Sequence, residues 1–291
     1  MKYRPTPLLL LFRSFLRSVD KDGIHGAMAY FSRRLVLSVK NYGLRGTFER
    51  EFIQAPQMAS SESSQPLMPH PFDLHHGTDT GGRISGARLD ALTLSSIYTT
   101  VYLATPPSTL QPALAALPVK HEDFTFVDIG CGKGRALMVA AQFPFRRLIG
   151  VEISPELCQI ARANVALNPA WKDRISIVNQ DAIKFHYPEG ALVLFAYYPF
   201  LTTILRRVLM NLKRQLRRSP RPAYLLFADL YATDADVLGN INPRYRQLMN
   251  SSLFLQEISD KVYPLSTEDT AAEPSGSKVS RFLLYSAGIV R

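Results

Sequence analysis

The chain has 291 residues, 46% of them hydrophobic, so it can bury a sizeable core in one large domain or two modest ones. Two cysteines are too few for a disulfide framework, and no apolar run approaches the ~20 residues of a membrane-spanning helix, so we expect a cytoplasmic protein without a transmembrane segment. The net charge of +10 favours anionic partners, but it does not distinguish nucleic acid, lipid headgroups and acidic protein.

Residues 1–54 are predicted to form a basic helical extension. Apolar side chains recur there at helical spacing in two stretches: Leu8, Leu11, Phe12, Phe15, Leu16 and Val19, then Ile24, Met28, Phe31, Leu35 and Val39. Gly43 is placed to end the second helix. The two helices either pack on the main domain or contact a membrane surface or nucleic acid, and the pattern leaves these alternatives open.

Residues 55–72 are rich in Ser and Pro and predict a flexible linker. Residues 73–119 form a lead-in to the main domain, and the stretch FDLHHGTDTGG, residues 72–82, gathers Asp, His and Thr side chains around three glycines. This stretch is interpreted as a polar lid over a ligand, as an ordinary glycine-rich connection, or as a metal site. Adjacent histidines do not match a familiar zinc spacing, and we assign no metal ligands.

Residues 120–291 alternate apolar runs of strand length with amphipathic helical stretches, which is typical of a parallel sheet covered on both faces. The predicted strands are residues 124–129, 147–151, 175–179, 192–196, 223–228, 253–262 and 279–285. The last two are expected to pair antiparallel across a long polar loop without a helix. Ser154 and Pro155 predict a helix start. The predicted fold class is therefore α/β, a doubly wound, mostly parallel seven-stranded sheet with an antiparallel C-terminal strand.

A glycine-rich turn follows the first of these strands, in the sequence FVDIGCGKGRAL. Such a turn lets backbone N–H groups approach a ligand closely. A phosphate-binding P-loop is excluded, because Lys133 is followed by Gly134 and not by Ser or Thr. A dinucleotide fingerprint would place its third glycine at Arg135, although a spacing that ends on Ala136 leaves nicotinamide or flavin cofactors open.

The segment DIGCGKG, residues 128–134, resembles the nucleotide-binding strand and turn of class I S-adenosylmethionine-dependent methyltransferases. By this resemblance the turn passes beneath the methionine and ribose of S-adenosylmethionine, Asp128 lies near the amino acid end, Glu152 binds the ribose hydroxyls and Asp181 faces the adenine. The implied cofactor-binding residues are Asp128, Gly130, Cys131, Gly132, Gly134, Arg135, Glu152, Ile153, Asp181, Ala182 and Tyr197. Three acids at three successive strand ends support this assignment, since ligands bind at the carboxyl ends of parallel strands.

The acceptor side is expected after the fourth strand, where Tyr198, Pro199 and Phe200 are the predicted catalytic residues lining the acceptor pocket. Amino-directed members of the superfamily carry Asn or Asp, then Pro-Pro and an aromatic, at this location. This chain has Tyr197 and Tyr198 before Pro199, and the departure puts a nitrogen acceptor in question. The arrangement is also similar to protein-lysine methyltransferases of the Dot1 type, which have an amide-bearing segment there.

Two basic features leave alternatives open. One of Lys133 and Arg135 could pair with the methionine carboxylate of the cofactor, and Arg135 could equally pair with a carboxylate of the fold. The segment 201–222 has seven basic residues and no acid, and its helix has arginines opposite its apolar side. That face is either merely solvated, or attracts an acidic protein, a phosphorylated metabolite or RNA.

The sequence therefore predicts a methyltransferase that uses S-adenosylmethionine and acts on an unidentified acceptor, such as a protein or small-molecule amine. An NAD(P)- or FAD-binding Rossmann oxidoreductase and a non-catalytic module that binds S-adenosylmethionine or a partner are the alternatives. The sequence does not indicate an oligomeric state.

Overall fold

The computed structural model describes residues 69–82, 84, 102–197, 202–229, 243–252, 254–272 and 279–287, together with scattered helical positions between 15 and 40. Most of the two predicted N-terminal helices, Gly43, nearly all of the linker, and residues 198–200 lie outside the described residues. The predicted boundaries of the extension, linker and lead-in therefore stay predictions. None of the helices in the described ranges has the length and apolar character needed to cross a membrane.

Seven strands form one sheet in the order β3-β2-β1-β4-β5-β7-β6. The strands are β1 (Phe124–Ile129), β2 (Arg147–Glu152), β3 (Ile175–Asn179), β4 (Ala191–Tyr197), β5 (Ala223–Asp229), β6 (Leu255–Pro264) and β7 (Val279–Ala287). The first five pair in parallel, whereas β7 runs antiparallel to both β5 and β6. The predicted fold class is confirmed.

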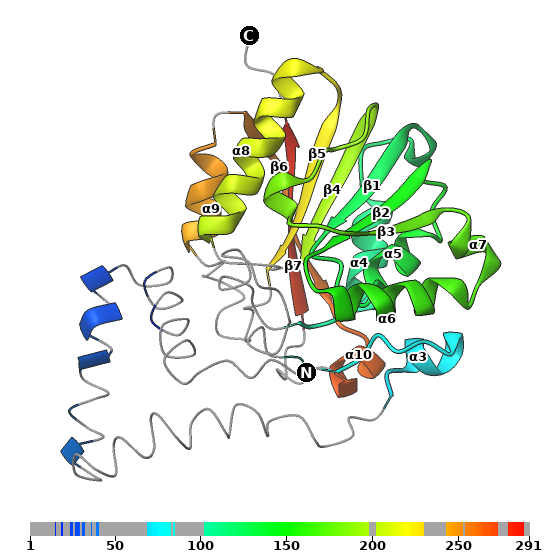
Figure 1. The fold of residues 1–291 in the computed structure, drawn as a ribbon, viewed down its shortest axis with the longest axis horizontal. Helices are drawn as coiled ribbons and strands as arrows, with labels where there is room; N and C mark the ends of the chain where they lie inside the picture. The colour runs from blue at the N-terminus through cyan, green and yellow to red at the C-terminus, as the bar shows by residue number, and fades with distance from the viewer. Residues whose placement is uncertain are drawn as a thin grey trace.

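Helices cover both faces of the sheet, as Figure 1 shows. One face packs against α4 (Pro107–Ala115), α5 (Arg135–Ala140) and α6 (Pro155–Ala166), and the other against α8 (Thr202–Arg218) and α9 (Pro243–Asn250). Every residue of β1 is buried, as expected for a central strand between two helical layers. The remaining short elements are α3 (Pro71–His76), α7 (Pro169–Lys172), α10 (Thr267–Ala272), η4 (His121–Asp123) and η5 (Ala182–Lys184).

Local sequence signals explain where α6 begins and which side of α8 is buried. The Ser154 hydroxyl accepts a hydrogen bond from the Leu157 N–H at 3.3 Å, and Pro155 occupies the first helical turn, as predicted. On α8 the predicted apolar side is buried, and Asn211 lies on the same side. The Asn211 side-chain amide donates to the Phe185 carbonyl at 2.8 Å, which satisfies a polar group in the helix-to-sheet layer.

The expectation of a polar loop without a helix between β6 and β7 is wrong, because α10 lies there. Its sequence, TEDTAA, has no apolar periodicity that could reveal a helix. The helix is anchored through Asp269, whose carboxylate accepts from His70 Nε2 at 2.7 Å and from the Ser108 N–H at 3.0 Å. His70 Nδ1 in turn accepts from the Phe72 N–H, so the proton of this histidine lies on Nε2.

A few described residues of the N-terminal part bear on these predictions. Ile24 and Met28, on the predicted apolar face, have exposed fractions of 55% and 59%, whereas the neighbouring Ala27 is fully buried. The alternatives for this face stay open. Helix α3 begins at Pro71, inside the predicted linker, and Phe72 joins the same hydrophobic cluster as α4 and the sheet.

We predict that Gly150→Ala destabilises the protein by about 1–3 kcal/mol, since extra atoms in a packed core force neighbouring groups to move. A Cβ atom at this position in β2 would lie 2.6 Å from both Cys131 Sγ and Leu137 Cδ1. Urea unfolding measures the effect. The exposed change Ser176→Ala on β3 is the control and should stay within ~0.5 kcal/mol of the parent. Equal stability of both variants would contradict this, because it would mean that the β1–α5 turn moves to accommodate the extra methyl group without loss of unfolding free energy.

Candidate functional site

The turn between β1 and α5 is held flat against the end of β2. Gly130, Gly132 and Gly134 have φ angles of 83°, 54° and 90°, a region that side chains with a Cβ rarely adopt. The N–H groups of Gly130 and Cys131 donate to the Val151 carbonyl at 2.8 and 3.1 Å. The turn therefore presents backbone, not side chains, at the carboxyl edge of the sheet, where ligands of such folds bind.

Two buried carboxylates lie beside this turn. Asp128 in β1 is 3% exposed, and within the described part of the chain its carboxylate has no hydrogen-bond donor. Burial, reinforced by the charge of Glu152, raises the pKa of Asp128 to about 8. A buried carboxyl group without a partner is costly, so it is a candidate ligand-binding group.

Glu152, at the end of β2, is also buried but is well supplied with donors. Its Oε2 accepts from the Gly132 N–H at 3.0 Å, and its Oε1 accepts from the Ser154 N–H at 2.8 Å. Burial raises the pKa of Glu152, and these backbone hydrogen bonds oppose the shift. A carboxylate offers about four acceptor positions, so each oxygen can accept one more hydrogen bond.

The third predicted strand-end acid, Asp181, follows β3. Its side chain accepts from the Ile183 N–H at 3.0 Å and so caps η5, which contains the buried Ala182. Ile153 is half-buried, and its carbonyl accepts from the Asn179 side-chain amide at 3.0 Å. Asp128, Glu152 and Asp181 thus end three neighbouring strands, as predicted, although Asp181 also has this structural role.

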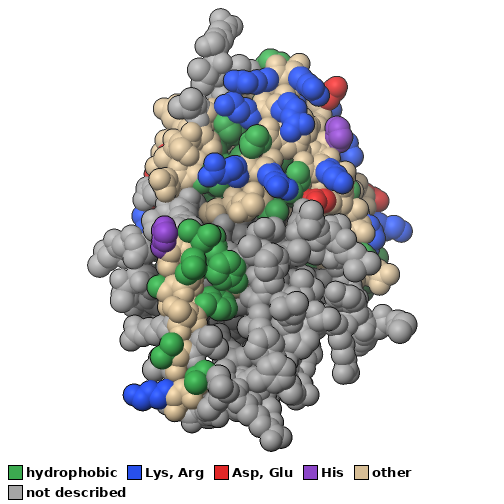
Figure 2. Space-filling model, turned by 60° about the vertical axis from the view of Figure 1, so that its left-hand side comes forward, with side chains coloured by type: hydrophobic (Ala, Val, Ile, Leu, Met, Phe, Trp, Pro, Cys, Tyr) green, Lys and Arg blue, Asp and Glu red, His purple; other side chains and the backbone are tan. Residues whose placement is uncertain are grey.

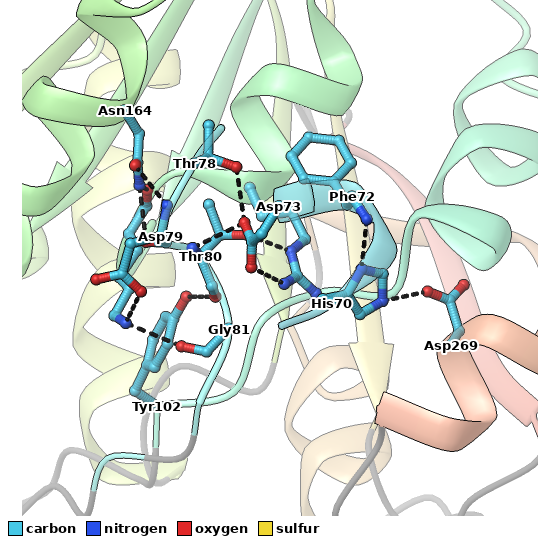
Figure 3. Close-up of polar contacts among 12 residues, drawn as sticks. His70, Phe72, Asp73, Thr78, Asp79, Thr80, Gly81, Tyr102, Asn164 and Asp269 are labelled. Carbon is cyan, nitrogen blue, oxygen red and sulfur yellow. Dashed lines mark hydrogen bonds and ion pairs between the residues drawn. The ribbon is translucent and has the colours of Figure 1, made fainter. Parts of the chain in front are cut away.

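The polar stretch from α3 to Gly82 packs against the start of α5, and Figure 3 shows its side chains converging there. The Arg135 guanidinium donates to Thr80 Oγ1 at 2.6 Å and to Asp73 Oδ2 at 3.2 Å. Burial opposes ionisation of Asp73, but hydrogen bonds from Thr80 and Thr78 and the Arg135 charge outweigh it and hold its pKa below the usual range. Of the two alternatives for Arg135, the carboxylate of the fold is the observed partner.

Lys133 is held by the same stretch. Its Nζ donates to Asp79 Oδ1 at 2.7 Å and to the Gly81 carbonyl at 2.9 Å. Asn164 of α6 joins the two layers, because its amide donates to the carbonyls of both Asp79 and Lys133 and its oxygen accepts from the Asp79 N–H. The stretch therefore acts as a fixed brace behind the turn.

Tyr102 is a neighbour of the turn that the sequence did not reveal. Its ring lies so close to Gly132 that a Cβ there would collide with it, and its hydroxyl donates to the Thr80 carbonyl at 2.6 Å. An isolated bridge between Ile84 and Tyr102 fixes this position. No motif surrounds Tyr102 in the sequence, so only the tertiary structure places it.

Of the other predicted site residues, some lie in the described ranges and some lie outside them. Cys131 contributes its backbone to the turn, but its thiol is buried in the core, and burial raises its pKa. Tyr197 ends β4 and packs against the core. Tyr198, Pro199 and Phe200 lie outside the described residues. Among the described residues, no cluster of three or more His, Cys, Asp or Glu side chains could hold a metal ion.

We predict that Asp73→Asn costs about 3 kcal/mol of unfolding free energy, because it leaves the Arg135 charge buried without its partner. Asp79→Asn removes a carboxylate from Lys133 but should cost less than ~1 kcal/mol, since the Asp79 side chain is 68% exposed. Denaturant unfolding measures both variants at pH 7, and equal losses would contradict the analysis.

Acid titration adds a second test of Asp73. Its pKa is lowered in the folded state, so its contribution is complete above about pH 4, the unfolded value, and is lost as the pH falls through the folded value. The unfolding free energy of the parent should therefore decline more steeply below pH 4 than that of Asp73→Asn.

The chain is similar in sequence to methyltransferases. Residues 126–219 match the family model of a methyltransferase domain. A protein-lysine N-methyltransferase of Saccharolobus islandicus (strain REY15A) is 30% identical over 122 residues, which are 41% of this chain and 72% of that protein. A tRNA1(Val) (adenine(37)-N6)-methyltransferase of Yersinia pestis is 44% identical over 73 residues, 24% of this chain and 29% of that protein.

Among solved structures, a chain from the complex between the Haloferax volcanii Trm112 methyltransferase activator and its methyltransferase has a TM-score of 0.46. It is 17% identical and covers 63% of this chain and 90% of that chain. The sequence match to the lysine methyltransferase, together with the family model, is what decides the assignment. This chain belongs to the class I S-adenosylmethionine-dependent methyltransferases.

Proposed function

We propose that the protein binds S-adenosylmethionine on the β1–α5 turn, between Asp128 and Glu152, and transfers its methyl group to an acceptor that enters after β4. The observation that carries this proposal is the buried Asp128 carboxylate, which has no donor in the described part of the chain although it lies beside the glycine turn at the carboxyl edge of the sheet. An amino acid ammonium group supplies the missing charge and donors.

The chemistry of Asp128 fits the amino acid end of the ligand. A cation within ~4–6 Å of a carboxylate favours its ionised form, so an ammonium group reverses the effect of burial. The neighbouring N–H groups of Gly130 and Cys131 already donate to Val151 and hold the turn in place. The ligand therefore meets a rigid surface and not a loop that must order on binding.

Glu152 fits a diol for a different reason. Its two oxygens are oriented by the backbone N–H groups of Gly132 and Ser154, which leaves one acceptor position on each oxygen. Two adjacent hydroxyl groups, as in a ribose, match these positions. Ile153, Asp181 and Ala182 follow the next strand ends and are proposed to border the base.

The bound cofactor supplies a methyl group on a cationic sulfur, which is activated before it reaches the protein. The protein must chiefly hold donor and acceptor in line, and good orientation alone can contribute ~7–11 kcal/mol. We propose Tyr198, Pro199 and Phe200 as the acceptor pocket, and Tyr197 at the boundary between cofactor and acceptor.

Two buried free thiols, Cys131 and Cys158, support the proposed cytoplasmic location, because such thiols suit a reducing compartment.

We predict that Glu152→Gln weakens binding of S-adenosylhomocysteine by about 10–100-fold, the equivalent of losing one hydrogen bond to a charged group. Calorimetric titration of the full chain measures this. Asp173→Asn, an exposed acid at the end of α7, is the control and should bind like the parent. Unchanged affinity in Glu152→Gln would place the cofactor elsewhere.

We also predict that binding of S-adenosylhomocysteine releases a proton and strengthens as the pH rises from 6 to 8. The free carboxyl of Asp128 has a pKa of about 8 and is mostly protonated below that pH, whereas the ligand ammonium favours the ionised form. Affinity should rise by at most about tenfold per pH unit and level off above pH 8.

Calorimetry in two buffers of different ionisation enthalpy counts the released protons. Asp128→Asn should show weaker binding that is flat between pH 6 and 8. A parent affinity that falls across this range would refute the role of Asp128.

A further inference from the structure

The exposed side of α8 has a set of arginines without carboxylate partners among the described residues. The arginine face consists of five exposed side chains: Arg206, Arg207, Arg214, Arg217 and Arg218. No ion pair joins any of them to an acid within the described ranges. Elsewhere in those ranges, Lys133, Arg135 and Arg281 each pair with an aspartate.

Charge on this face is concentrated, because the segment 201–222 contains no acid that could form a pair along the helix. Lys213 is half-buried beside Phe254 and adds a sixth charge at the margin of the face. Lys184 of η5, which packs beside α8, is exposed as well. Figure 2 shows Lys and Arg side chains gathered over the upper part of this side of the molecule.

The position of α8 connects this face with the proposed site. The helix begins at Thr202, five residues after β4 ends at the carboxyl edge of the sheet. Arg206 and Arg207 are therefore near the edge where the methyl group is proposed to be transferred. Arg217 and Arg218 lie about 17 Å further along the helix, at a rise of 1.5 Å per residue.

Phosphate is the ligand that best fits the five exposed guanidinium groups of the arginine face. Arginine forms bidentate hydrogen bonds with phosphate, and a nucleic acid backbone offers phosphates at regular intervals whatever its sequence. An acidic peptide offers carboxylates only where its sequence has them. The other side of α8 is buried against the sheet, so the arginines form an exposed surface along the helix, and a flexible unpaired strand can follow such a surface with successive phosphates.

We propose that the arginine face binds single-stranded RNA along its phosphate backbone and directs one end of the strand toward the carboxyl edge of the sheet. Unpaired strands of this kind occur in the loops, bulges and ends of folded RNA. The inference rests on the charges and placement of α8 and goes beyond the proposed cofactor site, because the face is able to bind RNA without S-adenosylmethionine.

Fluorescence anisotropy of a labelled 20-nucleotide RNA of mixed, unstructured sequence with the full chain tests the proposal. The variant Arg214→Ala/Arg217→Ala/Arg218→Ala should bind at least tenfold more weakly at 100 mM salt. The slope of log K against log salt should shrink by about 2, since single strands contribute ~0.7 per phosphate contact. A matched control, Lys120→Ala/Arg147→Ala/Lys172→Ala, removes the same charge from exposed positions outside α8 and should leave affinity and slope unchanged.

Several outcomes would overturn the inference: equal losses in both triple variants, no binding by the parent at 100 mM salt, or displacement of RNA by polyglutamate of equal charge. Tighter binding of single-stranded DNA of the same sequence would overturn the choice of RNA. Titration with S-adenosylhomocysteine separates this result from the cofactor proposal, because all three proteins should bind it equally.

Discussion

Backbone hydrogen bonds join the β1–α5 turn to the end of β2, with Gly130 and Cys131 donating to Val151 and Gly132 donating to Glu152. This contact requires glycine both in the turn and at Gly150 beneath it, where no side chain fits. Gly130 and Cys131 fix the turn to its neighbour, and the Gly132 N–H of the same turn orients the carboxylate proposed to bind ribose. Stability and ligand recognition therefore depend on one set of contacts.

The cations and the acids around this turn differ in whether they have charged partners. The cations Lys133 and Arg135 face the brace between α3 and Gly82, where Asp79 and Asp73 satisfy them. The acids Asp128 and Glu152 have no cationic partner in the described part of the chain. The two cations beside the turn are thus paired within the fold, whereas the two acids stay available for a ligand. This arrangement suits a ligand with an ammonium group and hydroxyls.

The strands, the antiparallel end of the sheet, the cap of α6 and the buried side of α8 were predictable because each follows from apolar periodicity or local turn chemistry. The strand-end acids followed from topology. Tyr102 and α10 were not predictable, since their positions depend on contacts between segments far apart in the sequence.

The hydrogen bond between His70 and Asp269 joins residues 199 positions apart, which lie on either side of the 126–219 region that carries the family match. Together with Phe72 in the core and Arg135 bound to Asp73, it makes the segment before β1 part of the same folding unit as the sheet. Cutting the chain at the ends of the 126–219 match would leave the buried Arg135 guanidinium without Asp73 and would expose the apolar surface that Phe72 covers. The segment that matches the family model is thus smaller than the structural unit in which Arg135 and Phe72 are buried.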